Sequence, residues 1–390
     1  MIYLATFGLS CLFFQISEKM EKPEKKIFSY TLSKPKQSFM YYACIAAALL
    51  IPSLLAGLRD SSIGTDVGVY GDYWLEYAEK YQHNFFAYIK MASEQSIGLI
   101  YALLNYISAF LTDDKKVFYF LLSFIETLMV YLGVRGFKDK ISVPFAMFCY
   151  YTIFYNNTLN LLRQSLAVAF VCFSYQFLVK NKYKAFWIVT VLAVLSHNSA
   201  VIALILFFVW EYLKRCDTKA SVYVSNVALF FVISFIMVAY KPFLQFFVEQ
   251  HILPERFLLY IQSTDVTGGR LIRIGFWILI GIFAYVAFYK MINYDSRNKF
   301  LMTCVTMSAA FSLILFMGNV YAIRVAYYFD GTAIIFIPMI PKVYKIKVDN
   351  AGNMRYLVYL ILAVILVVRW YLEYVRSLNG QTYPYHFAKF

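Results

Sequence analysis

Charged side chains are scarce in this chain, and acidic ones are the scarcer kind. Only 15% of its 390 residues are charged, with 22 Asp and Glu against 36 Lys and Arg, while 61% are hydrophobic. A soluble domain carries roughly 45–50% apolar and about 25% charged residues. The composition therefore excludes a soluble fold and predicts a chain that uses lipid as its solvent.

Metal and redox motifs are missing as well. The six cysteines are scattered, none forms a CxxC pair, and most fall within apolar runs, so we expect small buried hydrophobes. No second histidine or carboxylate stands at metal spacing from His197. The sequence therefore predicts no metal and no cofactor. The first 16 residues lack a basic n-region and a small-residue cleavage site, so they read as a retained helix rather than a signal peptide.

The net charge of +14 admits two interpretations. A basic balance can indicate nucleic-acid binding, but Lys and Arg also accumulate in the cytoplasmic loops of membrane proteins. The distribution along the chain favours the second, because the cations gather between apolar runs. We therefore expect membrane lipid, and no nucleic acid, as a partner.

Apolar runs long enough to suggest membrane spans recur along the whole chain. A transmembrane helix needs about 20 apolar residues, or about 17 when short. The His197-Asn198 pair breaks one long run into two helices that meet at a polar turn. The sequence therefore predicts an all-α polytopic membrane protein, 1–390, with about 12 transmembrane helices at 2–16, 39–56, 117–134, 143–156, 159–179, 184–197, 199–213, 222–240, 272–290, 300–317, 324–341 and 355–371.

The basic loops indicate an orientation. Twelve spans that start outside place 22 of the 36 cations in six cytoplasmic loops, as the positive-inside rule requires. The apolar stretch 97–111 would reverse every later loop if it crossed, so we expect an interfacial or re-entrant helix within a first extracytoplasmic loop, 57–116. A second large extracytoplasmic loop is expected at 241–271, and the tail from 373 is expected on the same side. Nearly all the unusual polar residues then share the outer face.

The first outer loop, Gly57-Leu58-Arg59-Asp60-Ser61-Ser62-Ile63-Gly64-Thr65-Asp66, is a candidate catalytic segment. Arg59 offers a rigid fork for phosphate, and Asp66 offers a carboxylate that can take a proton from a sugar hydroxyl. Tyr70 follows shortly after, and aromatic side chains in the outer loops could stack on sugar faces. A surface loop whose Asp and Arg pair with each other or face water is the alternative.

Arg163 and Gln164 stand at the outer end of an apolar helix. An arginine at mid-membrane costs at least about 2.5–3.5 kcal/mol, so it marks a functional site by default, although near a helix end it can snorkel to the headgroups. Arg324 opens another helix, with Tyr327 and Tyr328 at i+3 and i+4 on the same side. A guanidinium beside two phenols suits a phosphorylated or sugar-bearing ligand, and an interfacial Arg in an aromatic belt is the alternative.

His197 lies in the polar turn Leu195-Ser196-His197-Asn198-Ser199. Its reference pKa lies near neutrality, so it is a candidate ligand or base, although a lone histidine is more often structural. Glu126 and Asp330 fall inside predicted spans, where each is expected to pair with a helix neighbour.

Four features now stand in order: the Arg59–Asp66 loop, Leu162-Arg163-Gln164-Ser165-Leu166-Ala167, Leu195-Ser196-His197-Asn198-Ser199-Ala200 and Ile323-Arg324-Val325-Ala326-Tyr327-Tyr328. The ensemble closely resembles the EpsG-like and Wzy-type polysaccharide polymerases of bacterial envelopes. Glu94-Gln95-Ser96-Ile97-Gly98 resembles that family's Glu-x-x-Gly element with one extra residue, and Tyr383-Pro384-Tyr385 its closing Pro-Tyr. The resemblance runs from about residue 50 to the C-terminus.

The resemblance implies a GT-C-like helical body in the bacterial cytoplasmic (inner) membrane, with its active site facing the periplasm or exterior. There, a growing glycan on undecaprenyl pyrophosphate passes to a hydroxyl of the next lipid-linked repeat unit. No nucleotide sugar is expected, and a chain-length regulator protein is a further candidate partner. Arg163, Gln164, Arg324, Tyr328, Tyr70 and Glu94 are the expected substrate-binding residues. Asp66, with Arg59, is the expected catalytic pair, and His197 is either a phosphate-binding group in its protonated form or the base itself.

Three other classes are weighed against this one. A flippase or twelve-helix carrier should show two related halves and polar positions through the full membrane depth, whereas here no internal repeat is visible and the polar features gather on one side. An O-antigen ligase uses the same donor but a different acceptor. A membrane acyltransferase would place its histidine in a different constellation.

Overall fold

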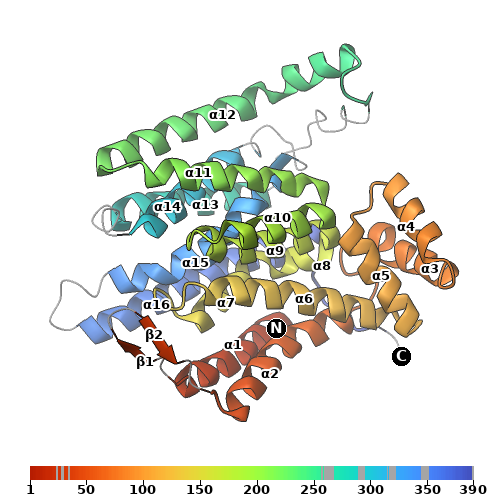
Figure 1. Ribbon diagram of the computed structural model, residues 1–390, viewed down its shortest axis with the longest axis horizontal. Coiled ribbons are helices and arrows are strands. Elements are labelled where there is room, and N and C mark those ends of the chain that lie inside the picture. The colour runs from red at the N-terminus through yellow and green to blue at the C-terminus, as the bar shows by residue number, and fades with distance from the viewer. Residues whose placement is uncertain are drawn as a thin grey trace.

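The computed structural model describes residues 1–22, 25–27, 30–33, 36–255, 258, 268–288, 295–313, 315, 322–343 and 351–388. Helices dominate this part of the chain, and the only strands in it are the antiparallel pair β1 (Lys25–Ile27) and β2 (Tyr30–Ser33). Most of the helices lie side by side in a stack, from α1 and α2 at one edge to α12 at the other (Figure 1). They are α1 (Ile2–Met20), α2 (Phe39–Gly57), α6 (Lys115–Arg135), α7 (Val143–Tyr150), α9 (Leu162–Leu178), α10 (Tyr183–Ser196), α11 (Leu204–Lys214), α12 (Lys219–Glu249), α13 (Gly268–Phe288), α14 (Ser296–Ser312), α15 (Tyr327–Val343) and α16 (Ala351–Trp370).

Each predicted apolar segment overlaps one of these helices, so the helical architecture is confirmed. Fewer of these helices are both long enough and apolar enough to be membrane spans. Within the described residues, four helices are long and apolar enough to cross a bilayer: Phe39–Gly57, Lys115–Arg135, Lys219–Glu249 and Arg355–Arg376. Twelve crossings therefore stay a prediction.

Local signals explain where several helices begin. The Ser38 hydroxyl accepts a hydrogen bond from the Tyr41 N–H at the start of α2, and Asp114 and Thr218 cap α6 and α12 in the same way. α12 runs for 31 residues, or about 46 Å at 1.5 Å per residue. The helix continues through Pro242 to Glu249, so the first nine residues of the loop expected at 241–271 are helical. Within that expected loop, residues 256–257 and 259–267 lie outside the described residues.

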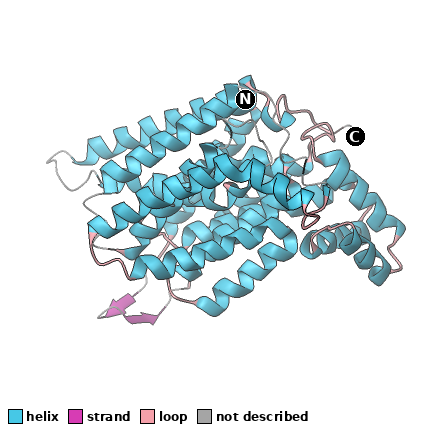
Figure 2. Cartoon of the chain, turned by 90° about the horizontal axis from the view of Figure 1, so that it is seen from above, coloured by secondary structure: helices cyan, strands magenta, loops and turns pink. Residues whose placement is uncertain are grey.

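The segment between α2 and α6 folds as a separate helical cap. It contains the π-helical turn η1 (Val67–Asp72) and helices α3 (Tyr73–Lys80), α4 (Phe85–Glu94) and α5 (Leu99–Leu111), which stand at one end of the stack (Figures 1 and 2). α5, the stretch expected to be interfacial or re-entrant, has 13 residues and packs on α3, α4 and α6. We call the end of the stack that carries this cap the polar end.

The C-terminal tail also lies at the polar end. The Asp60 N–H donates to the His386 carbonyl at 2.9 Å, and the Ala388 N–H donates to the Leu58 carbonyl at 2.9 Å. The Tyr3 hydroxyl reaches the Thr382 carbonyl at 2.5 Å. The first loop, the start of α1 and the tail, all expected on one face, therefore lie together.

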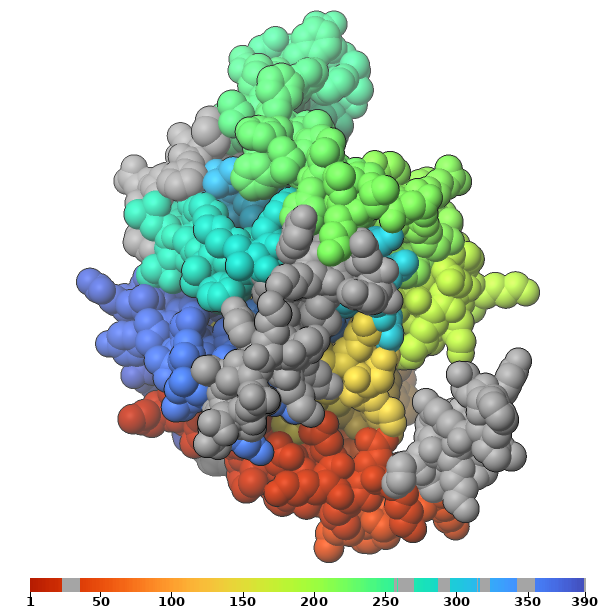
Figure 3. All heavy atoms as spheres, turned by 90° about the vertical axis from the view of Figure 1, so that its left-hand side faces the viewer, coloured from red at the N-terminus to blue at the C-terminus, as the bar shows by residue number. Residues whose placement is uncertain are grey.

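The opposite end, which we call the basic end, gathers the lysine-rich connections. Lys138 forms an ion pair with Glu21 at 2.6 Å, and Arg297 pairs with Asp139 at 3.0 Å. The Lys299 ammonium donates to the Cys216 carbonyl at 2.6 Å. Figure 3 looks onto this end, with the N-terminal segments at the bottom and α11 and α12 at the top. Four loops predicted to share one side of the membrane are therefore brought together.

Candidate active site

A cationic pocket opens at the polar end, between α8 (Asn156–Asn160), α13, the start of α15 and the tail. Its volume is about 390 Å³, within the range of small-molecule sites. Three guanidiniums and one carboxylate face it, those of Arg270, Arg273, Arg324 and Glu373. We call it the arginine pocket. Such a lining suits an anion with several oxygens, because the planar guanidinium binds phosphate in a bidentate manner.

Two buried ion pairs each contribute one residue, Arg273 or Glu373, to the lining of the arginine pocket. Arg273 pairs with Asp330 of α15, and its guanidinium stacks 4.7 Å from the centre of the Tyr327 ring. Arg369 pairs with Glu373 at 2.5 Å and donates to the Thr152 carbonyl at 2.9 Å. Charges this deep need partners, so these contacts fix the cations in place.

The expected partner of Asp330 is thus found, but that of Glu126 is not. Glu126 is buried in α6, and within the described chain neither of its carboxylate oxygens has a hydrogen-bond partner. The expected pairing of Glu126 with a helix neighbour is therefore not found among the described residues.

Asp66 lies at the edge of the arginine pocket. Its carboxylate stands 4.0 Å from the Arg324 guanidinium. The Asn160 side-chain oxygen accepts hydrogen bonds from the Asp66 N–H at 3.1 Å and from the Thr65 hydroxyl at 2.9 Å. Gly64 makes this turn possible: its φ is +103°, and a Cβ there would stand 2.5 Å from the Leu159 carbonyl oxygen. The loop is therefore anchored with Asp66 beside Arg324 and within the electrostatic influence of Arg163.

The surroundings of Asp66 poise it as a base. Burial raises the pKa of this carboxyl group above its ordinary value, while the Arg324 and Arg163 guanidiniums oppose the rise by favouring the carboxylate. A partly buried carboxylate with a raised pKa accepts a proton more readily than an exposed one.

Arg163 and Gln164 connect the cap to the arginine pocket. The Arg163 guanidinium donates to the Ser96 carbonyl at 3.2 Å and lies 3.9 Å from the centre of the Tyr70 ring. The Gln164 amide donates to the Arg324 carbonyl at 2.8 Å. These residues, predicted as one ligand-binding group, are brought together from three separate segments. Gln164 acts through the backbone of Arg324, and it does not line the arginine pocket.

His197 and Tyr328 are joined through Ser199. The Ser199 hydroxyl lies 2.7 Å from His197 Nδ1 and 2.8 Å from the Tyr328 hydroxyl. The Ser199 N–H also donates to Nδ1, at 3.3 Å. Because a backbone N–H can only donate, Nδ1 is the acceptor and Nε2 carries the proton.

The tautomer of His197 bears on its two expected roles. Because Nδ1 accepts from the Ser199 N–H, the structure holds the imidazole as a neutral ring with its proton on Nε2, rather than in the protonated form expected of a phosphate-binding group. Its turn is tightly packed, since a Cβ on Gly98 would stand 2.1 Å from the Ser196 carbonyl oxygen.

Arg59 and Glu94 are not brought to this centre. Arg59 is buried, donates to the Leu159 carbonyl at 2.6 Å and lies 4.2 Å from the centre of the Tyr119 ring. Its side chain therefore contacts the end of α8 and α6, and its expected catalytic role stays a prediction. Glu94 is exposed at the end of α4 and lines neither the arginine pocket nor the cavity beside Tyr70.

Sequence reasoning did not single out Arg270, Arg273 or Glu373. Arg270 and Arg273 sit at i and i+3 at the start of α13, and Glu373 follows four residues after Arg369. That spacing was the available signal, since charges at i,i+3 or i,i+4 share one helix face. A group of three or more His, Cys, Asp or Glu able to hold a metal ion does not occur in the described part of the chain.

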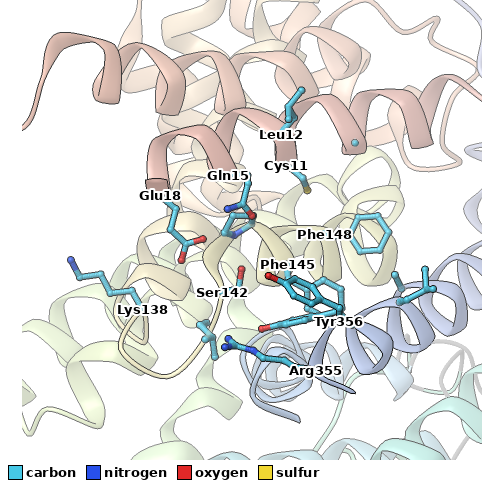
Figure 4. Close-up of a pocket in the computed structure, with 16 residues that line it drawn as sticks. Cys11, Leu12, Gln15, Glu18, Lys138, Ser142, Phe145, Phe148, Arg355 and Tyr356 are labelled. Atoms are coloured by element: carbon cyan, nitrogen blue, oxygen red, sulfur yellow. The ribbon is translucent and has the colours of Figure 1, made fainter. Parts of the chain in front are cut away.

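A larger cavity than the arginine pocket lies elsewhere, between α1, α7 and α16, with a volume of about 1010 Å³. Figure 4 shows Glu18 and Lys138 at one side of it and Leu12 and Phe148 at the other. Lys138 belongs to the basic end, and none of the predicted site residues lines this cavity. Size alone therefore does not mark the reactive centre.

The fold and the composition define a polytopic membrane protein with a cationic pocket at one end of its helical body. A family model for the EpsG family matches residues 41–387, and the chain belongs to that family. Membership assigns it to polysaccharide biosynthesis. No curated protein matches the chain, and no solved structure does either.

Proposed function

We propose that this chain polymerises undecaprenyl-pyrophosphate-linked oligosaccharide repeat units at the outer face of a bacterial cytoplasmic membrane. The observation that carries the proposal is the Asp66 carboxylate, 4.0 Å from Arg324 at the edge of a pocket lined by three arginines. An anion-binding pocket beside a partly buried base is the pair of parts that glycosyl transfer from a pyrophosphate needs.

The reaction uses these parts in one displacement. The donor pyrophosphate binds in the arginine pocket, where Arg324 and Arg270 face its oxygens. A hydroxyl oxygen of the acceptor repeat unit attacks the anomeric carbon of the donor glycan. The new carbon–oxygen bond forms as the bond to pyrophosphate breaks, and undecaprenyl pyrophosphate leaves with the electron pair. The acceptor proton passes to Asp66, and such general-base help is worth about 10²–10⁴-fold.

The arginines contribute most where negative charge develops. As the pyrophosphate leaves, its charge grows, and preorganised donors in a water-poor site stabilise it more than bulk water does. His197 supports this role through a neutral Nε2–H, held in orientation by Ser199 and Tyr328. Arg163 keeps the cap docked and biases Asp66 toward the carboxylate.

A null strain separates this function from its alternatives. Loss of long chains while single repeat units still reach the surface supports a polymerase. Loss of all surface repeats contradicts it and indicates a flippase or an O-antigen ligase. Complementation by the wild type, but not by Asp66→Asn at equal membrane level, ties the phenotype to this site.

A further inference from the structure

A second cavity, of about 570 Å³, lies in the cap and differs in chemistry from the arginine pocket. Its walls come from η1, α3 and the end of α4, and four aromatic rings face it: Tyr70, Tyr73, Trp74 and Tyr77. We call it the aromatic pocket. Among the described residues that line it there is neither Lys nor Arg, so this lining does not suit a phosphate group.

The rings form an ordered surface. Tyr73 and Tyr77 stand at i and i+4 on α3, with ring centres 4.7 Å apart, and the Trp74 ring lies 5.9 Å from that of Tyr77. Trp74 is only 5% exposed and forms the floor, whereas Tyr73 is 47% exposed at the mouth. The Gln95 amide also lines the cavity. A sugar ring has an apolar C–H face and polar hydroxyl edges, which match aromatic walls with a few polar groups.

The aromatic pocket is continuous with the candidate active site through Tyr70. The Tyr70 N–H donates to the Asp66 carbonyl at 2.9 Å, one turn after the proposed base. The same ring that faces the aromatic pocket stacks on Arg163, 3.9 Å from its guanidinium carbon. A glycan whose reacting hydroxyl stands at Asp66 would therefore extend its next residues along this surface.

We propose that the aromatic pocket is a glycan subsite, which holds an uncharged sugar of the oligosaccharide next to the bond being formed. It rests on the proposed function and adds to it the place where the glycan, rather than its pyrophosphate, is recognised. The alternative use of exposed aromatics, insertion into the membrane interface, is separated from glycan binding by the test below.

The test measures binding of a lipid-free oligosaccharide, so that it does not depend on turnover. One to three repeat units, released from the producing strain's own polysaccharide and purified, are titrated into the detergent-purified protein, with saturation-transfer NMR and calorimetry as readouts. Tyr73→Leu keeps apolar character but removes the ring face, and about a tenfold loss of affinity is expected. Tyr73→Phe keeps the ring and should bind within about twofold of the wild type. Phe86→Leu, an exposed aromatic of α4 outside the pocket, is the matched control and should bind normally.

Each result decides the subsite separately from the polymerase. Normal binding by Tyr73→Leu, or equal loss in Phe86→Leu, overturns the subsite even if the wild type polymerises. If both Leu variants bind the oligosaccharide normally but unfold at a lower temperature than the wild type in lipid nanodiscs, the exposed aromatics act as a membrane anchor instead. Tyr73-dependent binding in a protein that never polymerises supports the glycan site and refutes the proposed reaction. In cells, Tyr73→Leu should shift the polymer to shorter chains, and Phe86→Leu should not.

Discussion

The side-chain oxygen of Asn160 accepts a hydrogen bond from the backbone N–H of Asp66 at 3.1 Å, across 94 residues of sequence. The same oxygen accepts from the Thr65 hydroxyl at 2.9 Å. One amide thus anchors the loop that presents the proposed base, at the corner of the arginine pocket.

Asn160→Ala should therefore impair the reaction through loop position rather than charge. Removing both hydrogen bonds is expected to lower the unfolding free energy by about 1–2 kcal/mol and to reduce polymer formation at least tenfold. Thr65→Val removes one bond and keeps the side-chain shape, so it should fall between Asn160→Ala and the wild type. Thermal unfolding in detergent and a polymer assay measure the two effects. Wild-type turnover by Asn160→Ala would remove Asn160 from the site.

A methyl group on Gly98 should disturb His197. The added Cβ would stand 2.1 Å from the Ser196 carbonyl oxygen, and backbone cannot yield as a flexible side chain can. Overpacking of this kind costs about 1–3 kcal/mol, so Gly98→Ala should unfold at a lower temperature and lose activity. Gly275→Ala, where no atom lies within 4 Å of the new Cβ, is the control and should match the wild type. Equal stability in both variants would mean that α5 does not pack on the His197 turn.

The Ser199 bridge predicts a coupled pair of mutations. Ser199→Ala and Tyr328→Phe each break the chain of hydrogen bonds that orients His197. Once one hydrogen bond of this chain is removed, removing the other has little further effect on the orientation of His197. The double variant should therefore lose much less donor affinity than the product of the two single losses, with a coupling energy of about 0.5–3 kcal/mol. Donor affinity of the four proteins forms the cycle. Additive losses would show that Ser199 and Tyr328 act independently.

The raised pKa of Asp66 predicts the direction in which stability changes with pH. Because burial raises the folded-state pKa, the contribution of this group to stability is fully present below the ordinary Asp value of about 3.9. It is lost as pH rises through the folded value. Asp66→Asn, which resembles the protonated acid, should therefore unfold at a higher temperature than the wild type at pH 7, and the gap should close toward pH 4. Asp113→Asn, an exposed position of the same segment, controls for the loss of a carboxylate. A wild type more stable than Asp66→Asn at pH 7 would contradict the buried, disfavoured carboxylate.

The helical body and the grouping of its polar segments were predictable, but the interior of the site was only partly so. Apolar runs and lysine-rich loops follow from composition, and Arg163, Gln164 and Arg324 were grouped correctly because each stands at a helix end. The position of Arg59 away from the arginine pocket could not be predicted, because one sequence does not reveal that its guanidinium donates to the Leu159 carbonyl, a hundred residues away. Arg273 was missed for the same kind of reason, because its partner Asp330 belongs to another helix.

Orientation can be tested without activity. Single cysteines at Ser61 and Gln381, both exposed at the polar end, should react with an impermeant thiol reagent in intact spheroplasts. Asp139→Cys, at the basic end, should react only after lysis. Five of the native cysteines are buried, and Cys11 is partly buried, so the background should be low. The reverse pattern would place the arginine pocket in the cytoplasm.

The central claim is that Asp66 takes the acceptor proton beside an arginine pocket that holds the donor pyrophosphate. Its most direct test is polymerisation by purified protein in liposomes, with undecaprenyl-pyrophosphate-linked repeat units as the substrate. The wild type should build a ladder of chains, while Asp66→Asn should bind the donor normally and extend nothing. Arg324→Lys should lose donor affinity, and His197→Gln should bind the donor more weakly. A ladder from Asp66→Asn at near wild-type rate, with a His197→Gln variant that binds the donor normally and is inert, would reverse the roles and contradict the account.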